Sequence, residues 1–483
     1  MFNLKVLVAA GAALATAICI VGTPVHAAVP TTAPKVEWRE CGDNVQCALL
    51  PVPLDHQASS RTSRTIWLGM SKRSATGERR GTIIITAGTQ NGGATSLVHQ
   101  LQPNLKAMNV HYDLVGVDTR GVGRSSPAVL CTTFEENRVF EAPLSASQTT
   151  ADREARITEA RNITAKCQER SGDLLPYMGT TQSVEDLERV RVALGEPRLN
   201  LLAMSQGSVL GQAYLAHHGD HMDKLILDSP FDSKQWVQHP FAFDRDQMVA
   251  TEQTLDTFFS WCKNNPANCR FGDGDPRAAF ERMLADKRQT RLENPGRWDL
   301  LTDGALIDMI SGGMISPATW PQFSRSLEDL SKTSETPVQM QTGWDTAFSE
   351  YYSESCLDRA LPRDVASYDR ALKEAKLAAP YLGGRYGYAE FKCQQWPVAP
   401  KPLTDAWLNP AHVDVLVLSA RHDPLAPWAG AVRTANRLDA RRVDIDAPGH
   451  LQMGRSECVD RAVDTFLESG AQPRTIACTA SIP

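Results

Sequence analysis

Short apolar runs rich in β-branched residues recur along this chain and alternate with segments of helical pattern. A typical run is GTIIIT at 81–86, and a typical helical segment is TQSVEDLERVRVALG at 181–195, which stops at Gly195. Runs without polar alternation indicate strands that are buried on both faces of a parallel sheet. The alternation therefore predicts an α/β protein whose mostly parallel sheet is covered by helices. The predicted strands are 81–86, 112–118, 199–204, 223–228, 413–419 and 441–446.

The alternation stops between about residues 240 and 405, where the pattern is helical and rich in aromatic residues. Because this segment separates two late strands, it should emerge at the carboxyl edge of the sheet, where α/β proteins bind ligands. We therefore expect a large helical cap over a site. The predicted domains are the first part of the α/β core at 28–239, the cap at 240–405 and the rest of the core at 406–483.

The first 27 residues have the pattern of a secretory signal peptide. Lys5 gives a positive start, a long apolar run follows, and Val25-His26-Ala27 resembles a cleavage site. A retained membrane anchor is the alternative, since the apolar run is nearly long enough to span a bilayer. The break at Pro24 and the small residue at Ala27 favour cleavage near Ala27. We therefore expect a secreted protein, extracellular or periplasmic, without stable membrane association after cleavage.

Removal of the signal peptide removes Cys19 and leaves ten cysteines. An even number in an exported chain indicates disulfides. A metal site is the competing interpretation, but no CxxC motif or histidine cluster supports it. The spacing suggests sequential pairs, although sequence alone does not fix the connectivity. The candidate pairs are Cys41–Cys47, Cys131–Cys167, Cys262–Cys269, Cys356–Cys393 and Cys458–Cys478.

The net charge of −6 at pH 7 is spread along the chain. Such a distribution gives no electrostatic support for a nucleic-acid partner or an anionic membrane surface. With 42% apolar and 22% charged residues, the composition is that of a soluble globular protein. No motif suggests a metal ion or an organic cofactor, and none indicates an oligomeric state.

The segment LNLLAMSQGSVLGQAYLAHH at 199–218 carries the first candidate for chemistry. A predicted strand ends at Ser205 and a helical pattern follows at once, as in a nucleophile elbow. The tight turn strains the serine backbone and demands small residues two positions before and after it, which Ala203 and Gly207 satisfy. The short motif is weak by itself, but the strand before it and the helix after it favour Ser205 as a nucleophile.

A serine hydroxyl needs a base, and the base needs an acid that orients it. In proteins with this elbow the chain order is serine, acid, histidine, with the last two on loops after late strands. Asp423 follows the fifth predicted strand and His450 follows the sixth, so both should lie at the same sheet edge. His422 is a rival base, but it adjoins the acid on one loop. Asp414 and Asp446 lie within the strands and are interpreted as structural.

A tetrahedral intermediate also needs backbone N–H donors for its oxyanion. One predicted donor is the amide of Gln206, directly after the nucleophile. The second should come from the loop after the first predicted strand, whose glycines allow a close approach to a ligand. Gly88 and Thr89 are the candidates, and a merely flexible loop is the alternative.

Three segments resemble one known family. YDLVGVDTRGVGRSSPAVLC resembles that family's D-x-R-G-x-G-x-S segment, the elbow lies in a similar helix–strand–elbow block, and the closing SEC…PRTIAC is also similar. From about Cys41 to Cys478 the chain resembles the secreted tripeptidyl aminopeptidases of the α/β-hydrolase superfamily, relatives of the proline iminopeptidases. The resemblance implies an α/β-hydrolase fold in which Asp118 and Arg120 form a structural pair beneath the oxyanion loop.

The same resemblance implies that Ser205 is the nucleophile, Asp423 the acid and His450 the base of a peptidase. Two departures border the reacting centre: Gly88-Thr89-Gln90-Asn91 replaces the usual G-G-P-G, and the elbow has the A-x-S-x-G form. Because a backbone donor survives a changed side chain, neither departure removes the mechanism, but both leave the substrate class open.

Three functions therefore compete, and none requires a cofactor. The first is a secreted aminopeptidase that releases short peptides from an N-terminus. The second is an esterase or amidase for a small acyl or secondary-metabolite substrate. The third is a catalytically silent binding protein, against which the complete Ser-Asp-His set argues. An aminopeptidase would need an acid for the substrate amine; Glu252, Glu350 and Glu354 are possible, although a solvated helix face explains them equally well.

Overall fold

The computed structural model divides into two compact units, Met1–Pro34 and Lys35–Pro483, and the second unit contains the fold. The predicted signal peptide lies outside the described residues. Within these residues no helix combines the length and the apolar character needed to cross a membrane. The described residues are 35–58, 63–88, 93–100, 105–133, 136, 150–294, 300–332, 344–385, 390–403, 407–470 and 473–482.

The centre of the fold is a ten-stranded sheet with the order β1-β2-β3-β5-β4-β6-β7-β8-β9-β10. All six predicted strands form, and wherever two of them are neighbours in the sheet they run parallel. The mostly parallel sheet predicted from the apolar runs is therefore confirmed. These strands are β4 (Gly81–Thr86), β5 (Tyr112–Val117), β6 (Leu199–Met204), β7 (Met222–Asp228), β8 (Asp414–His422) and β9 (Arg441–Pro448).

Four further strands extend the sheet at its two ends. At one end β1 (Arg39–Glu40), β2 (Gln46–Pro53) and β3 (Thr65–Arg73) pair in antiparallel fashion, and β3 joins them to β5. At the other end β10 (Thr475–Cys478) runs parallel to β9. None of these four strands was predicted, because their exposed positions interrupt the apolar pattern that marks most of the central strands.

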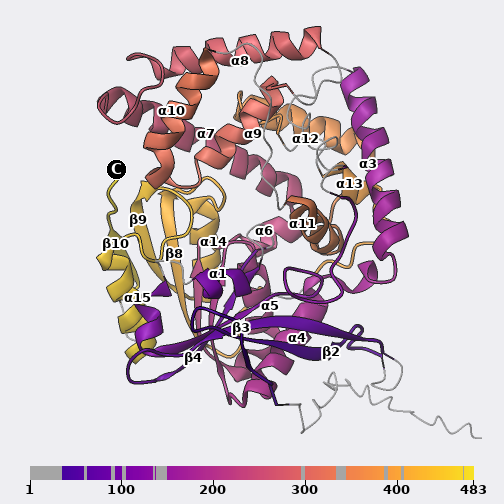
Figure 1. Cartoon of the computed structure of the whole chain (residues 1–483), viewed down its shortest axis with the longest axis vertical. Helices are drawn as coiled ribbons and strands as arrows, with labels where there is room; N and C mark the ends of the chain where they lie inside the picture. Colours follow the sequence, from indigo (N-terminus) through magenta and orange to yellow (C-terminus); the bar gives the residue numbers. More distant parts are fainter. Residues whose placement is uncertain are drawn as a thin grey trace, which may run out of the picture. The chain divides into compact units, whose positions relative to one another are not determined.

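Helices cover both faces of the sheet (Figure 1). Successive strand residues point to opposite faces, so Leu201 packs with one layer of helices and Leu202 with the other. The first layer contains α4 (Thr180–Leu194), α5 (Gly207–His218) and α14 (Trp428–Leu438). The second contains α1 (Ala94–Gln100) and α15 (Glu457–Ser469).

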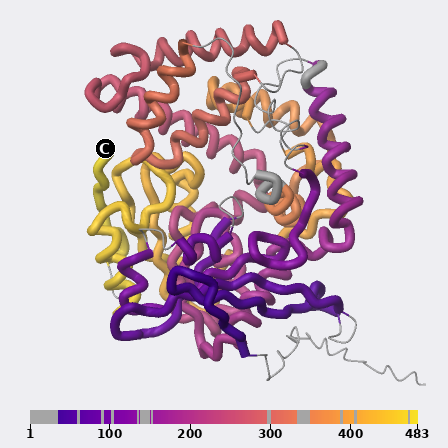
Figure 2. Tube along the Cα trace, in the orientation of Figure 1, coloured from indigo at the N-terminus to yellow at the C-terminus, as the bar shows by residue number. Residues whose placement is uncertain are grey.

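The segment between β7 and β8 is helical, as predicted, and Figure 2 lets the chain be followed out of β7, through these helices and back into β8. Buried aromatic residues, among them Phe258, Phe280 and Trp320, give it an apolar cluster of its own. The division into core and cap domains stays a prediction. The helices are α6 (Ser233–Gln238), α7 (Pro240–Asn264), α8 (Pro276–Glu293), α9 (Asp303–Gly313), α10 (Trp320–Ser331), α11 (Trp344–Asp358), α12 (Val365–Ala378) and α13 (Phe391–Gln394).

Helix α3 (Thr150–Ser171) precedes α4 in the chain and packs against α13 of the inserted segment. Within the described residues, short 3₁₀ helices occupy several connections. They are η3 (Met108–Val110), η5 (Leu175–Tyr177), η6 (Gly219–His221) and η7 (Pro317–Thr319).

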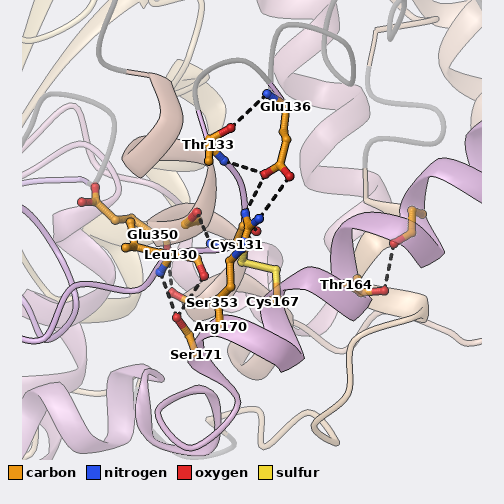
Figure 3. The surroundings of a disulfide bond; sticks show 12 residues. Leu130, Cys131, Thr133, Glu136, Thr164, Cys167, Arg170, Ser171, Glu350 and Ser353 are labelled. Atoms are coloured by element: carbon orange, nitrogen blue, oxygen red, sulfur yellow. Dashed lines mark hydrogen bonds and ion pairs between the residues drawn. A yellow bond between two sulfur atoms is a disulfide. The ribbon is translucent and has the colours of Figure 1, made fainter.

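The ten cysteines after the predicted cleavage site form the five disulfides suggested by their spacing. Figure 3 shows Cys131–Cys167, which ties the chain after β5 to α3. The N–H of Cys131 also donates to Ser349 Oγ of α11 at 2.9 Å. This disulfide therefore fixes a segment that in turn contacts the inserted helix α11.

Candidate active site

Ser205 occupies the tight turn between β6 and α5. Its φ of +52° lies in the left-handed region, which is strained for a residue with a side chain, and its N–H donates to the carbonyl of Asp228 at 2.9 Å. A Cβ on Gly207 would lie 2.8 Å from the backbone of Ala87 after β4. Glycine at 207 thus allows the turn to approach the loop that was expected to supply an oxyanion donor.

The structure brings Ser205, His450 and Asp423 together in one hydrogen-bonded chain. Ser205 Oγ lies 2.9 Å from His450 Nε2, and His450 Nδ1 lies 3.0 Å from both carboxylate oxygens of Asp423. The side chains of His450 and Asp423 are only 6% and 1% exposed. The three residues follow β6, β9 and β8, because the carboxyl ends of parallel strands meet at one edge of the sheet.

Backbone groups fix the Asp423 carboxylate and the histidine loop. Oδ1 of Asp423 accepts the N–H groups of Leu425 and Ala426, both at 2.9 Å. The N–H of His450 donates to the carbonyl of Ile315, which belongs to the inserted segment, at 2.9 Å. The acid is therefore held by its own loop, whereas the histidine is held in part by the insertion.

Asp228 also holds the histidine loop, a role that was not predicted from the sequence. Its Oδ1 accepts the N–H of Gln452 at 2.7 Å and its Oδ2 accepts that of Met453 at 3.1 Å. Its backbone carbonyl accepts the N–H of Ser205, so one residue links the elbow to the histidine loop. The sequence feature that could have identified Asp228 is its place at the carboxyl end of the predicted strand 223–228.

The two neighbouring carboxylates control the charge of His450. Burial lowers the pKa of His450, but Asp423, through its charge and hydrogen bond, and Asp228, through its charge, raise it above its usual value. Burial raises the pKa of Asp228 itself to about 6. The site therefore favours a positive charge on the imidazole when its carboxylates are ionised.

The rival residues have other partners. The carbonyl of His422 accepts the N–H of Gly449 at 3.1 Å, whereas His450 makes the contact to Ser205 Oγ. Asp414 pairs with Arg441 at 3.0 Å, in agreement with the structural role predicted for it. Asp446 is 70% exposed and lies 3.8 Å from Arg421.

Gly88 lies beside Gln206, as expected of two neighbouring oxyanion donors. A Cβ built on Gly88 would be 2.9 Å from the Cβ and 3.6 Å from the backbone nitrogen of Gln206. Thr89, the other candidate, lies outside the described residues. The oxyanion roles of Gln206, Gly88 and Thr89 stay predictions.

A family model described as "alpha/beta hydrolase fold" matches residues 89–454. The chain belongs to this α/β-hydrolase fold family. The fold implied by the sequence resemblance is therefore confirmed, and the strand order around the Ser205 turn agrees with it.

Curated relatives cover nearly the whole of this α/β hydrolase. Tripeptidyl aminopeptidase of Streptomyces lividans is 26% identical in an alignment of 475 positions, which covers 92% of this chain and 86% of the relative. Serine protease Hip1 of Mycobacterium tuberculosis is 26% identical in an alignment of 511 positions, which covers 97% of this chain and 95% of the relative. Carboxylesterase B of Mycobacterium tuberculosis is 27% identical in an alignment of 485 positions, which covers 93% of this chain and 91% of the relative. With the family match, these relatives identify the α/β hydrolase as a serine hydrolase and confirm the resemblance to tripeptidyl aminopeptidases.

Asp118 and Arg120 do not form the structural pair that the resemblance implied. Arg120 instead forms a buried, two-pronged ion pair with Asp186, at 2.8 and 2.6 Å. Asp118 accepts the N–H and the hydroxyl of Thr95, at 2.9 and 2.6 Å, and the N–H of Arg124. Asp118 and Arg120 thus have different partners, and each anchors a different part of the α/β hydrolase.

The three acidic residues considered for amine binding differ in their surroundings. Glu252 accepts the N–H groups of Tyr381 and Leu382, both at 3.1 Å, and thereby holds a turn of the inserted segment. Glu350 is 2% exposed, which contradicts a solvated helix face, and accepts the N–H of Gly123 at 3.0 Å. In Figure 3 its carboxylate points away from the Cys131–Cys167 disulfide.

Glu354 lies one turn after Glu350 on α11 and is close to the elbow. Burial raises the pKa of Glu354 to about 8, and the nearby Asp358 carboxylate adds to this rise, while the side chain of Gln206 lowers it. Asp358 in turn accepts the hydroxyl of Thr180 at 2.6 Å. The α/β hydrolase thus has a carboxyl group beside the residue that follows Ser205.

Two groups of described side chains could bring three metal-ligand atoms within 4.8 Å of one another. One combines a histidine with two cysteines that are joined in a disulfide. The other consists of Glu188, His218 and His221, but both oxygens of Glu188 accept hydrogen bonds from Arg191, and one also accepts from Tyr214. Because these donors occupy the carboxylate, we assign no metal-binding role to this group.

Proposed function

We propose that this serine hydrolase is a secreted aminopeptidase that releases short peptides from the N-terminus of a substrate. Ser205 acts as the nucleophile, His450 as the general base and Asp423 as the acid that orients the histidine. The amides of Gln206 and of Gly88 or Thr89 stabilise the oxyanion. The hydrogen-bonded chain from Ser205 to Asp423 supports these roles and argues against a silent binding protein.

The reaction proceeds by acyl transfer to water. His450 Nε2 takes the Ser205 proton as Oγ attacks the substrate carbonyl, and Asp423 stabilises the imidazolium that results. The histidine then gives this proton to the leaving amine, and the acyl group stays on Ser205. A water molecule, activated by the same histidine, releases the acyl group as the free peptide. Each oxyanion donor contributes about a hundredfold or more in rate.

The observation that carries the peptidase assignment is the carboxyl group of Glu354 beside the elbow. The ammonium group of a free peptide N-terminus would bind this carboxylate and favour its ionised form, since opposite charges lower the pKa of an acid. The distance from such an anchor to the nucleophile would limit how many residues precede the cleaved bond. The tripeptidyl aminopeptidase relative is consistent with this function.

An esterase or amidase for a small acyl or secondary-metabolite substrate is the second candidate. The altered loop Gly88-Thr89-Gln90-Asn91 favours it, as does the relative named carboxylesterase B. Both candidates use the same three residues, so only the substrate separates them.

Five disulfides support the secreted location, because such bonds persist in oxidising compartments. The signal-like pattern ending near Ala27 is consistent with it. Sequencing the N-terminus of the protein recovered from the medium or periplasm tests the proposed cleavage.

The decisive test compares hydrolysis of matched chromogenic substrates by the mature protein and by Ser205→Ala. The panel contains di- and tripeptide anilides with free or blocked amino ends, together with short acyl esters. We expect the protein to cleave free-amine tripeptide anilides and Ser205→Ala to cleave none of them. Turnover of esters without peptides would establish the second candidate, and activity that survives in Ser205→Ala would overturn the nucleophile assignment.

A further inference from the structure

Helix α7 of the inserted segment presents a stripe of three polar side chains to the loop that carries Asp423. Gln247, Thr251 and Thr254 are spaced four and three residues apart, so they share one face of the helix. Gln247 Nε2 donates to the carbonyl of Leu425 at 2.5 Å, and Thr251 Oγ1 donates to that of Pro424 at 2.8 Å. Farther along the stripe, Thr254 Oγ1 lies 3.1 Å from the carbonyl of His422 and donates to it.

Two of these contacts end on the peptide groups that hold the Asp423 carboxylate. The carbonyl of Pro424 and the N–H of Leu425 belong to one peptide group, and the carbonyl of Leu425 and the N–H of Ala426 belong to the next. Both N–H groups donate to Asp423 Oδ1 at 2.9 Å. Because a trans peptide is planar and its C=O and N–H point in opposite directions, a donor that fixes the carbonyl also aims the N–H.

The hydroxyl of Thr251 has an acceptor within its own helix besides the loop carbonyl. The hydroxyl of Thr251 also lies 2.8 Å from the carbonyl of Gln247, four residues earlier in the same helix, which would satisfy it. Thr251 is fully buried and Gln247 is 6% exposed, so water does not replace them as donors to the loop. The loop carbonyls are therefore the groups that gain a partner.

On the basis of the catalytic role proposed above for Asp423, we propose that Gln247 and Thr251 are positioning residues for this acid. They fix two peptide groups whose N–H donors hold the carboxylate against His450 Nδ1. Helix α7 thereby contributes to turnover as well as covering the sheet. Loss of either side chain should lower kcat and leave KM nearly unchanged, since neither residue contacts Ser205 or His450 in the hydrogen-bonded chain.

The test uses Thr251→Val, which removes the hydroxyl and keeps the shape, with Thr251→Ser as the rescue variant. Thr257→Val is the matched control, because the hydroxyl of Thr257 donates within α7 to Gln253 at 3.0 Å. Activity is measured on p-nitrophenyl butyrate and on a free-amine tripeptide p-nitroanilide. We expect Thr251→Val to lower kcat about fivefold, the effect of one ordinary hydrogen bond, with KM within about twofold. The Ser variant and the control should stay within about twofold of the wild type in kcat.

A double-mutant cycle separates positioning from a general structural effect. In the Asp423→Asn background, Thr251→Val should cause no further fall in kcat, because the group that it positions is already changed. An equal fall in both backgrounds, a fall matched by Thr257→Val, or a change in KM alone would overturn the positioning role. If Asp423→Asn left the rate of hydrolysis unchanged, that result would instead overturn the proposed function.

Discussion

Helices α7 and α11 both belong to the segment between β7 and β8, and both reach the residues around Ser205, but with different chemical groups. Helix α7 supplies neutral donors, a glutamine amide and two threonine hydroxyls, and all three end on backbone carbonyls of the Asp423 loop. Helix α11 supplies carboxyl groups, with Glu350 against Gly123 N–H and Glu354 near the side chain of Gln206.

The polar groups of α7 satisfy the fold, whereas α11 has a carboxyl group near the site. A neutral donor that is hydrogen-bonded to a buried carbonyl satisfies the fold, and its hydrogen is no longer available to a substrate. Glu354 is half-buried and burial raises its pKa, so its ionised form is unfavourable in the folded protein. The amine-binding role proposed for Glu354 is consistent with this raised pKa. In the roles proposed above, α7 supports turnover by positioning Asp423, and α11 selects the substrate through Glu354. The following predictions test this division of roles between the two helices.

The largest effect is expected at the acid that α7 holds. Asp423→Asn should lower kcat about ten-thousandfold on both peptide anilides and esters, because a neutral amide neither orients His450 nor stabilises its positive charge. Steady-state kinetics on the two substrate classes check this. Asp446→Asn is the control, since Asp446 is 70% exposed, and it should leave kcat unchanged. A fall in kcat on only one substrate class would contradict the proposal that the Asp423 loop held by α7 supports turnover of both classes.

A smaller and selective effect is expected on α11. Glu354→Gln should lower kcat/KM about 10- to 100-fold for free-amine tripeptide anilides, which is the worth of a hydrogen bond to a charged group. Blocked peptides and esters should react as with the wild type, because they carry no ammonium group. Glu252→Gln is the matched control, since Glu252 holds the turn at Tyr381 and Leu382. An equal loss of kcat/KM on free-amine and blocked substrates would show that Glu354 does not bind the substrate amine.

The pH dependence tests the electrostatics of His450. Because Asp423 and Asp228 raise the pKa of His450 above its usual value of 6.5, kcat/KM should increase with pH and reach half its plateau above pH 6.5. Asp228→Asn removes one negative charge, which lowers the pKa of His450. The ratio of activity at pH 6 to activity at pH 8 should therefore rise in this variant, even where the absolute rate falls. An unchanged midpoint would show that Asp228 acts only through its hydrogen bonds to Gln452 and Met453.

The smallest expected effect is on stability. Burial raises the pKa of folded Glu354 to about 8, above its value in the unfolded chain, so its contribution is fully favourable only below the unfolded pKa and is lost as pH rises through about 8. Glu354→Gln removes this titration and should raise Tm by about 1–3 °C at pH 9, with a smaller rise at pH 5. Calorimetry at the two pH values measures the difference. Glu457→Gln, at a side chain that is 91% exposed, should change Tm at neither pH.

The central sheet could be predicted because its signal is local. Most of the predicted strands, such as Leu199–Met204, are buried at nearly all positions and are therefore largely apolar runs. Strand β2 carries no such run, since Pro51 and Pro53 interrupt it and buried positions alternate with exposed or half-buried ones. Its place in the sheet depends on pairing with β3, which no single segment reveals.

The same distinction applies to the candidate site. Ser205, Asp423 and His450 each follow a recognisable strand, so their meeting at one sheet edge could be predicted from their order. Thr251 could not be recognised, because a threonine on a helix has no marked pattern and its contact, Pro424, lies 173 residues away. Asp118 and Arg120 show the opposite error. The resemblance implied that they form a pair, but each has other partners in the structure.

The five disulfides join each cysteine to the next one along the chain, at separations of 6, 36, 7, 37 and 20 residues. None encloses another, and none joins the inserted helices to the sheet strands. In a chain that enters an oxidising compartment from its N-terminus, the first cysteine of each pair would meet its partner as the next thiol to emerge. Oxidation in the order of emergence would then give the observed set of pairs.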